Sequence, residues 1–150
     1  MVHIKKVASK GNPMNNSTSM SQVPELDETV KTIRKAGCEK FILLKCTSTY
    51  PATPKNSNVL TLPHMRELFK CEVGLSDHTM GIGSSVAAVA HGATVIEKHF
   101  TLNRMDGGVD SAFSRAAKVI DADYHVPCLL YTSDAADEGL GVDLGGRRII

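Results

Sequence analysis

The chain has 150 residues, the length of one ordinary domain, and its 42% hydrophobic and 22% charged residues are typical of a soluble globular protein. Its formal net charge of +1 argues against nucleic-acid binding, and no apolar run approaches the ~20 residues that span a bilayer. The four cysteines lack CxxC and zinc-finger spacing, and no signal-peptide core is present. We therefore predict reduced thiols and a cytoplasmic protein that binds neither nucleic acid nor membrane.

Strand and helix signals alternate from the first proline onward. Pro13–Thr18 lies where a first strand is expected. Ser21 can cap a helix that has Pro24 in its first turn and ends before Gly37, a residue suited to the position after a helix. The predicted buried face of this helix consists of Val23, Leu26, Val30 and Ile33.

The same alternation continues to about residue 100. Phe41–Leu44 is a short apolar run of the buried-strand kind, and a polar loop with two prolines follows it. The later elements are a helix with Leu62, Met65, Leu68 and Phe69 on one face, a strand at Glu72–Leu75, a helix at Ser84–His91 and a strand at Thr94–Glu97. Strands joined by helices form a parallel sheet with right-handed crossovers. The fold class is therefore α/β, a partial (β/α)8 barrel with two open sheet edges.

The pattern weakens after residue 114. Residues 128–150 do not resemble natural protein sequence, since Cys128–Glu138 and Val142–Ile150 match, in order, translations of two sequencing-library adapters. We expect residues 1–114 to form the partial barrel and residues 128–150 to form no domain and carry no function. Residues 115–127 are assigned to neither part.

Two histidines carry the strongest chemical signal. His78 and His99 each follow an apolar strand, and one helix-length segment separates those strands. The carboxyl ends of parallel strands meet at the mouth of an α/β barrel, where neutral imidazoles can bind a divalent transition metal. Asp77 and Glu97 could fix the imidazole tautomers or add ligands. Spacing alone equally allows a pair of hydrogen-bonded, partly buried histidines.

Three further segments could bind substrate. The segment Lys45–Pro51 offers hydroxyl groups and a lysine that suit a carboxylate or phosphate, although such residues also serve as turn formers. Ser17–Met20 precedes a helix and could seat a phosphate or simply cap that helix. Asp110, in a glycine-rich loop, could bind sugar hydroxyls or cap a turn.

Four motifs in order, KCTSTYPA, VGLSDHTMGI, GATVIEKHFTL and GGVDSAFS, resemble the sialic acid synthase family. The resemblance covers about Ile4–Ser114, and the wording of the first and last motifs is most similar to the pseudaminic acid branch. It implies a TIM barrel followed by a small antifreeze-like domain, assembled as a homodimer. The matching region is the second half of the barrel.

The resemblance implies a transferase that condenses phosphoenolpyruvate with an N-acetylated sugar of the 6-deoxy-diacetamido-altrose type, giving pseudaminic acid and phosphate. A divalent metal, Mn²⁺, would polarise the aldehyde of the open-chain sugar. Alternatives are N-acetylneuraminate or legionaminic acid synthesis, a different metal-dependent barrel lyase or isomerase, and a non-catalytic half-barrel. The 150 residues alone are expected to be inactive, because the lysines that pair with phosphoenolpyruvate belong to the first half of the family's barrel.

Site residues carry over by position from the family's motifs. The resemblance makes His78 and His99 the metal ligands and Glu97 and Asp110 catalytic residues near the metal and sugar. The positions matching phosphoenolpyruvate-binding residues are Ser17, Ser48, Tyr50 and Ser76.

Two departures from the family pattern carry structural expectations. Asn15 and Asn16 stand in a strand that is usually apolar, and either side chain would be costly if buried without partners. Ser19 replaces a glycine and should resist a positive φ.

Overall fold

A computed structural model describes residues 2–108, 110, 111 and 114–116 of the chain. They fall into two compact units, of which the first ends at His99 and the second begins at Phe100. Residues 117–150, including the expected adapter-derived segment, lie outside the described part.

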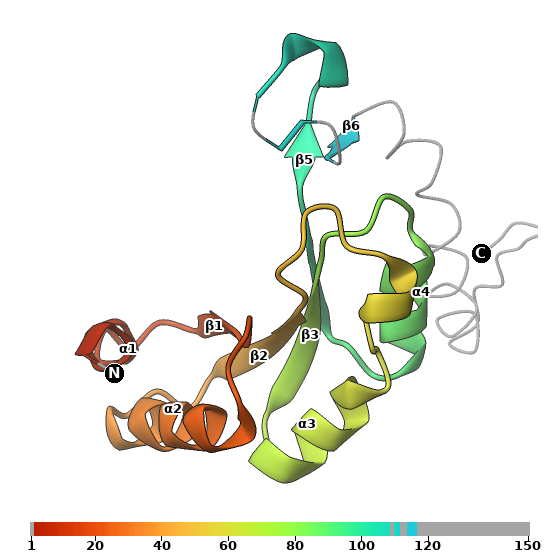
Figure 1. Cartoon of the computed structure of the whole chain (residues 1–150). Coiled ribbons are helices and arrows are strands. Elements are labelled where there is room, and N and C mark those ends of the chain that lie inside the picture. Colours follow the sequence, from red (N-terminus) through yellow and green to blue (C-terminus); the bar gives the residue numbers. More distant parts are fainter. Residues whose placement is uncertain (1, 109, 112–113, 117–150) are drawn as a thin grey trace, which may run out of the picture. The chain divides into compact units, whose positions relative to one another are not determined.

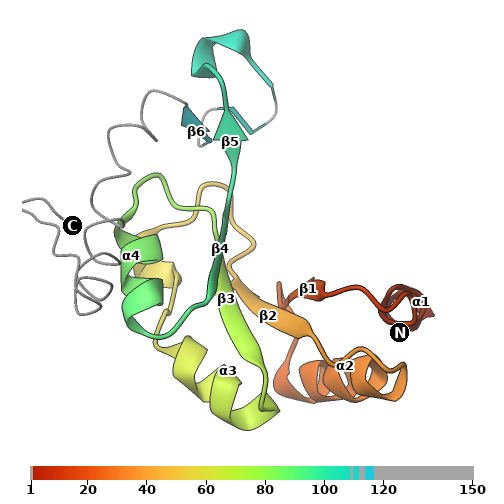
Figure 2. The same cartoon turned by 180° about the vertical axis from the view of Figure 1, so that it is seen from behind.

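The first unit contains a four-stranded parallel sheet in the order β1-β2-β3-β4, as the sequence predicts (Figures 1 and 2). Its strands are β1 (Met14–Ser17), β2 (Phe41–Cys46), β3 (Glu72–Asp77) and β4 (Val95–Lys98). Consecutive strands are neighbours and are joined by helices, so the unit has the topology of half a (β/α)8 barrel.

The helices between the strands are also those predicted, with small shifts at their ends. They are α2 (Val23–Lys35), α3 (Thr61–Phe69) and α4 (Gly83–Ala90), and a 3-10 turn at Pro54–Asn56 precedes α3. A short helix that the sequence analysis did not predict, α1 (Val2–Ala8), precedes β1. The second unit contains β5 (Phe100–Thr101), a 3-10 turn at Arg104–Asp106 and β6 (Arg115–Ala116). Among the described residues no helix is long and apolar enough to cross a membrane.

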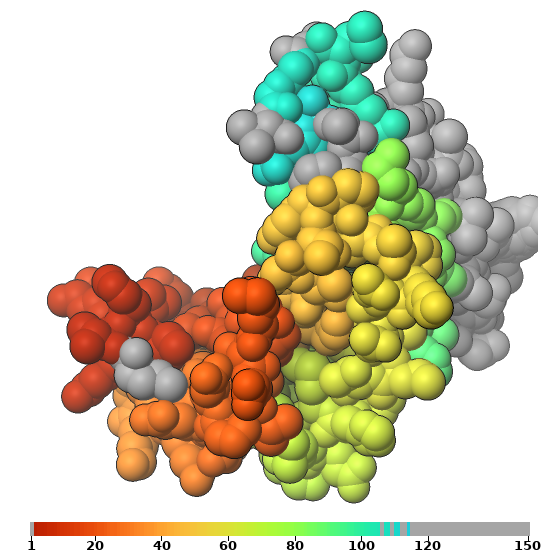
Figure 3. Space-filling model, viewed as in Figure 1, coloured from red at the N-terminus to blue at the C-terminus, as the bar shows by residue number. Residues whose placement is uncertain are grey.

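The hydrophobic core lies between the sheet and its helices. Inward-facing residues of α2 and α3 pack against alternate residues of the central strands, such as Leu43, Val73 and Leu75. The segments of α2 (orange) and α3 (yellow-green) are neighbours at the surface (Figure 3), where the Arg34 guanidinium donates to the carbonyls of Phe69 and Lys70 at 2.8 Å. This contact satisfies carbonyls at the C-terminal end of α3.

Three details differ from the expectation. The residue that caps α2 is Gln22, whose backbone N–H donates to the Glu25 carboxylate at 3.3 Å, whereas Ser21 is held in a turn by a bond to the Thr18 carbonyl. Val23 is 56% exposed, because it precedes the first buried turn of the helix. Leu68 is 58% exposed, and the buried face of α3 consists of Leu62, Met65 and Phe69.

The two asparagines of β1 avoid the cost of burial. Asn15 is exposed and Asn16 is half-buried with its amide donating to the Ser17 carbonyl at 3.3 Å. Ser19 adopts a φ of +42°, so the backbone there takes the conformation that glycine tolerates best. Its hydroxyl is 2.8 Å from that of Ser48.

We predict that Gly74→Ala will destabilise the sheet. A Cβ at Gly74 would overlap the carbonyl oxygen of Val95 and lie 2.7 Å from Cδ2 of Leu44. Because a backbone atom cannot yield easily, the expected loss of unfolding free energy is about 1–3 kcal/mol, measured by denaturant unfolding. The control is Gly83→Ala, at the first residue of α4, where nothing lies within 4 Å. Equal stabilities of the two variants would contradict the prediction.

Candidate metal and substrate site

The two predicted metal ligands lie side by side at the carboxyl edge of the sheet. The β3–β4 ladder pairs Ser76 with Glu97 and Asp77 with Lys98, and His78 and His99 are the next residues of the two strands. Their ring centroids are 5.0 Å apart with an interplanar angle of 54°. His78 is buried and His99 is half-buried. The register of the parallel strands therefore brings two imidazoles together.

The face of the sheet below the imidazoles is polar. Side chains alternate between the two faces of a strand, so Ser76 and Glu97 share the face of the two histidines. The buried Ser76 hydroxyl donates to Oε1 of Glu97 at 2.6 Å. Cys46, the register partner of Ser76, places its Sγ 4.0 Å from Nδ1 of His78. The apolar pattern predicts a strand that ends at Leu44, and so it does not place Cys46 at the site.

The loop after β2 covers His78. The backbone N–H of Ala52 donates to the His78 carbonyl at 2.9 Å, and Ala52 forms a parallel bridge with Thr79. This attachment holds the Tyr50 ring edge-on to both imidazoles, with centroids 4.5 Å from His78 and 6.2 Å from His99. Tyr50 therefore contacts the candidate metal ligands directly.

Burial, followed by the nearby His99 ring, lowers the pKa of His78 below its ordinary value, and Asp77 and Glu97 only partly oppose this shift. This direction of the pKa shift favours the neutral form of His78. A neutral imidazole keeps the nitrogen lone pair that metal binding requires.

Asp77 points to the other face of the sheet. Its Oδ1 accepts from the Thr79 N–H at 2.8 Å, and its Oδ2 accepts from the Ser85 hydroxyl at 2.6 Å and from the Lys98 ammonium at 2.9 Å. Burial alone would raise the pKa of Asp77, but these hydrogen bonds together lower it. The expectation that Asp77 fixes an imidazole tautomer or ligates a metal is therefore wrong, since both oxygens are bonded on the opposite face.

The hydroxyl-rich loop is only partly directed to the site. Lys45 lies one residue before Cys46 and so on the other face, where its ammonium donates to the Thr47 hydroxyl at 2.7 Å. Thr47 in turn donates to the Asn56 carbonyl at 3.1 Å. Burial lowers the pKa of Lys45. These two residues stabilise the turn, which was the alternative interpretation of their role.

The remaining predicted substrate residues lie at two places. Ser17 ends β1 and is exposed, and its register partner is Leu44 of β2. Ser48 is half-buried and contacts Ser19, so both hydroxyl segments meet at the carboxyl edge. Asp110 belongs to the second unit, where its carbonyl accepts from the Ser114 N–H and hydroxyl. Its predicted catalytic role stays a prediction.

The chemistry of the donor set is compatible with one ion. Metal–imidazole bonds measure ~2.0–2.1 Å, so two rings on one ion stand a few ångströms apart, as His78 and His99 do. Among the described residues no group of three or more His, Cys, Asp or Glu side chains is arranged to hold a metal. Two imidazoles fill only two coordination positions of an ion, so the other positions would be open to water or substrate.

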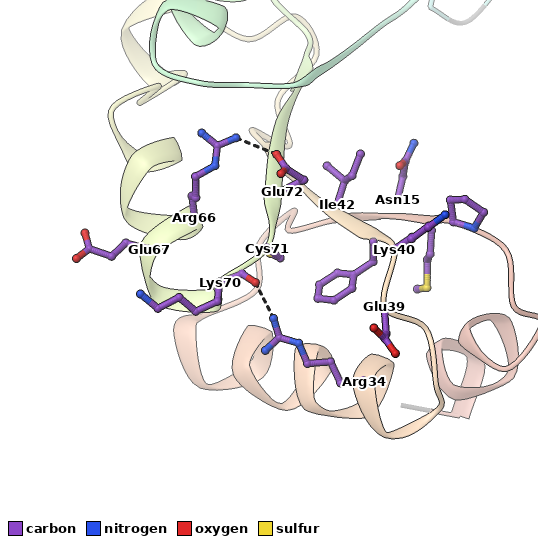
Figure 4. A pocket seen from close by; sticks show the side chains of 13 residues that line it. Asn15, Arg34, Glu39, Lys40, Ile42, Arg66, Glu67, Lys70, Cys71 and Glu72 are labelled. Atoms are coloured by element: carbon purple, nitrogen blue, oxygen red, sulfur yellow. Dashed lines mark hydrogen bonds and ion pairs between the residues drawn. The ribbon is translucent and has the colours of Figure 1, made fainter.

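A separate pocket of about 710 Å³ lies at the amino ends of β1, β2 and β3 (Figure 4). Arg34 and Arg66 line it, and both serve the structure: Arg34 binds the end of α3, whereas Arg66 pairs with Glu72 and donates to the Gly92 carbonyl at 2.7 Å. The pocket is at the opposite end of the strands from the histidines and is not the candidate site.

A four-stranded parallel half-barrel with paired histidines and hydroxyl groups at its carboxyl edge defines the fold class, a segment of a TIM barrel with its candidate site at that edge. Residues 1–122 match the NeuB family, and the chain belongs to that family.

Individual relatives agree with this assignment. The chain is 41% identical over 110 residues to an N,N'-diacetyllegionaminic acid synthase of Campylobacter jejuni, covering 72% of this chain and 33% of the relative. It is 38% identical over 111 residues to a pseudaminic acid synthase of the same organism, covering 74% and 32%. Among solved structures, spore coat polysaccharide biosynthesis protein spsE of Bacillus subtilis matches with a TM-score of 0.80 at 29% identity, covering 91% of this chain and 38% of that protein. The chain thus spans about a third of the length of these curated relatives.

Proposed function

We propose that this chain carries the metal-binding part of the active site of a phosphoenolpyruvate-dependent nonulosonic acid synthase. The observation that carries the proposal is the pairing of His78 and His99 beside the Ser76–Glu97 hydrogen bond at the carboxyl edge of the half-barrel. Relatives named as synthases of legionaminic and pseudaminic acids support the same activity.

The residues at this edge can share the work of the condensation. His78 and His99 would hold a divalent metal, for which we propose Mn²⁺, and the metal would supply Lewis-acid activation of a carbonyl group. Glu97 is exposed and accepts the Ser76 hydroxyl, so its carboxylate is placed to accept a proton or a hydrogen bond from a substrate hydroxyl. Tyr50 closes one side of the imidazole pair.

The carboxylate and phosphate of phosphoenolpyruvate would be bound by hydroxyl groups. Ser17, Ser48 and Ser76 lie at the ends of three neighbouring strands or just beyond them. Hydroxyl and backbone N–H donors at such positions suit an anion. Asp110 would contact the sugar.

We propose pseudaminic acid as the product, on the wording of the KCTSTYPA and GGVDSAFS motifs. The legionaminic acid synthase of Campylobacter jejuni is 41% identical and the pseudaminic acid synthase 38%, so legionaminic acid is the second candidate.

We further propose a cytoplasmic enzyme that works as a homodimer. The part of the chain that the structure describes contains the free thiols of Cys38, Cys46 and Cys71, and free thiols are typical of a reducing compartment.

A chimera tests the proposal. The 111-residue segment that aligns with the Campylobacter jejuni pseudaminic acid synthase would replace its counterpart in that enzyme. Phosphate release would be measured with phosphoenolpyruvate, Mn²⁺ and the sugar precursors of pseudaminic, legionaminic and N-acetylneuraminic acids. The proposal predicts metal-dependent release with the pseudaminic precursor. A folded chimera that is inactive with all three sugars would overturn it, and activity with another precursor alone would correct the product.

We predict that the 150-residue chain alone binds Mn²⁺ more weakly than micromolar and releases no phosphate. Two imidazoles are its only proposed protein ligands, and half a barrel does not hold them as rigidly as a closed one would. Titration calorimetry with Mn²⁺ measures the affinity. Micromolar binding that disappears in His78→Ala would contradict this prediction.

A further inference from the structure

Each histidine of the candidate site is preceded by one member of a buried ion pair. Asp77 precedes His78 on β3, and Lys98 precedes His99 on β4. Adjacent residues of a strand point to opposite faces, so the ion pair lies behind the sheet while the imidazoles lie in front of it. The ion pair and the histidine pair are therefore adjacent in the sequence: Asp77 is bonded to His78, and Lys98 is bonded to His99.

The ion pair is a short and well-shielded contact. The Lys98 ammonium lies 2.9 Å from Oδ2 of Asp77, and the side chains are 15% and 1% exposed. Lys98 also donates to the Thr79 carbonyl at 2.6 Å, and Asp77 accepts from the Thr79 N–H. The Ser85 hydroxyl, from the first turn of α4, donates to the same carboxylate. His78 is thus enclosed between two residues whose positions this network fixes.

The Asp77–Lys98 ion pair lies at the end of the β3–β4 ladder, immediately before the two histidines. Asp77 and Lys98 are the last register partners of the β3–β4 ladder. Beyond this register pair, the Lys98 ammonium also donates to the carbonyl of Thr79, the residue after His78. The Asp77–Lys98 ion pair connects the two strands immediately before the histidines.

We propose that Asp77 and Lys98 are positioning residues that set the separation and orientation of the His78 and His99 rings. The pair would act from behind the sheet and touch no substrate. The contribution of the ion pair to metal binding rests on the proposed function, whereas its effect on the geometry of the two rings does not.

The test measures the ring geometry without a metal. The 150-residue chain would be labelled with ¹³C-histidine, and the nuclear Overhauser effect between the His78 and His99 rings recorded with no added ion. We expect a cross-peak in the parent chain, since the centroids are 5.0 Å apart, and its loss in Lys98→Met. The control is Arg66→Met, which removes an ion pair with Glu72 at 3.0 Å, at the other end of β3. The cross-peak should persist in this control.

A cross-peak that survives in folded Lys98→Met would overturn the proposal, and so would equal loss in both variants. If Lys98→Met does not fold, Asp77→Asn/Lys98→Met removes the unpaired charge and serves in its place, with the same expected loss. Addition of Mn²⁺ to the parent chain tests the proposed function separately, because a paramagnetic ion held by both rings broadens their signals selectively. An inter-ring cross-peak without such broadening at high Mn²⁺ would count against metal binding and leave the positioning role standing.

Discussion

Replacing Lys98 by methionine is expected to lower the free energy of unfolding of this chain by about 3–5 kcal/mol. Methionine fills similar space but leaves the Asp77 carboxylate buried without its cation. The hydrogen bonds from Ser85 and Thr79 remain, yet two neutral donors do not compensate a full charge in a shielded position. Urea unfolding followed by circular dichroism measures the difference between the variant and the parent chain.

A second ion pair of the same length provides the control. Lys31 and Asp27 are also 2.9 Å apart, on one exposed face of α2, with side chains 67% and 51% exposed. Water screens both charges there, so Lys31→Met should change stability little. The comparison separates burial from distance. If Lys98→Met loses no more free energy of unfolding than Lys31→Met, the buried ion pair stabilises the chain no more than the exposed one.

The pH dependence of the same variant has a definite sign. In the parent chain the hydrogen bonds lower the pKa of Asp77, so its contribution to stability is present above the unfolded-state pKa of about 3.9 and is lost as the pH falls through the folded-state value. Without Lys98, burial should raise the folded-state pKa of Asp77. As the pH falls, protonation then neutralises the buried carboxylate and recovers part of the variant's free energy of unfolding. The stability difference between parent and variant should therefore narrow in acid. A difference that is constant from pH 7 to pH 4 would contradict this account.

The alternating apolar runs predicted the sheet because each run is long enough to define a buried strand. Phe41–Leu44 and Glu72–Leu75 were both found, but each strand continues two residues further, to Cys46 and Asp77. Polar residues mark these extensions because they lie at the carboxyl edge of the sheet, where the candidate site is. The apolar pattern ends before the polar residues of the candidate site, so it could not assign Cys46 to that site.

The direction of a side chain was harder to predict than its position. Asp77 and Lys45 were both expected to serve the site, yet each lies on the face opposite to it. The alternation of side chains along a strand contains this information, since Asp77 adjoins Ser76 and His78. Using it requires knowing that the strand continues to that residue. The exposed Leu68 and Val23 show the same limit for helices, where periodicity defines a face but not how far the neighbouring sheet extends over it.

In the chimera that contains this segment, His78→Ala should reduce metal-dependent phosphate release by at least about 10³-fold. Lewis-acid activation contributes several kcal/mol to transition-state stabilisation, and each 1.36 kcal/mol corresponds to about tenfold in rate. Under the proposed function His78 and His99 hold the ion together, so the loss of either ring should release it. The effect should therefore be similar for His99→Ala, and the double variant should be little worse than either single one, because the two ligands act as a unit.

The control for these variants is His64→Ala. His64 is an exposed histidine of α3, a helix outside the carboxyl edge of the sheet, so its removal tests the effect of losing a histidine without touching the site. Its activity should equal that of the parent chimera. Raising the Mn²⁺ concentration distinguishes weaker binding from lost chemistry: partial recovery of His78→Ala would mean that the ion still reaches a productive position. Full activity in either single variant at ordinary Mn²⁺ concentration would show that this histidine pair is not the metal site.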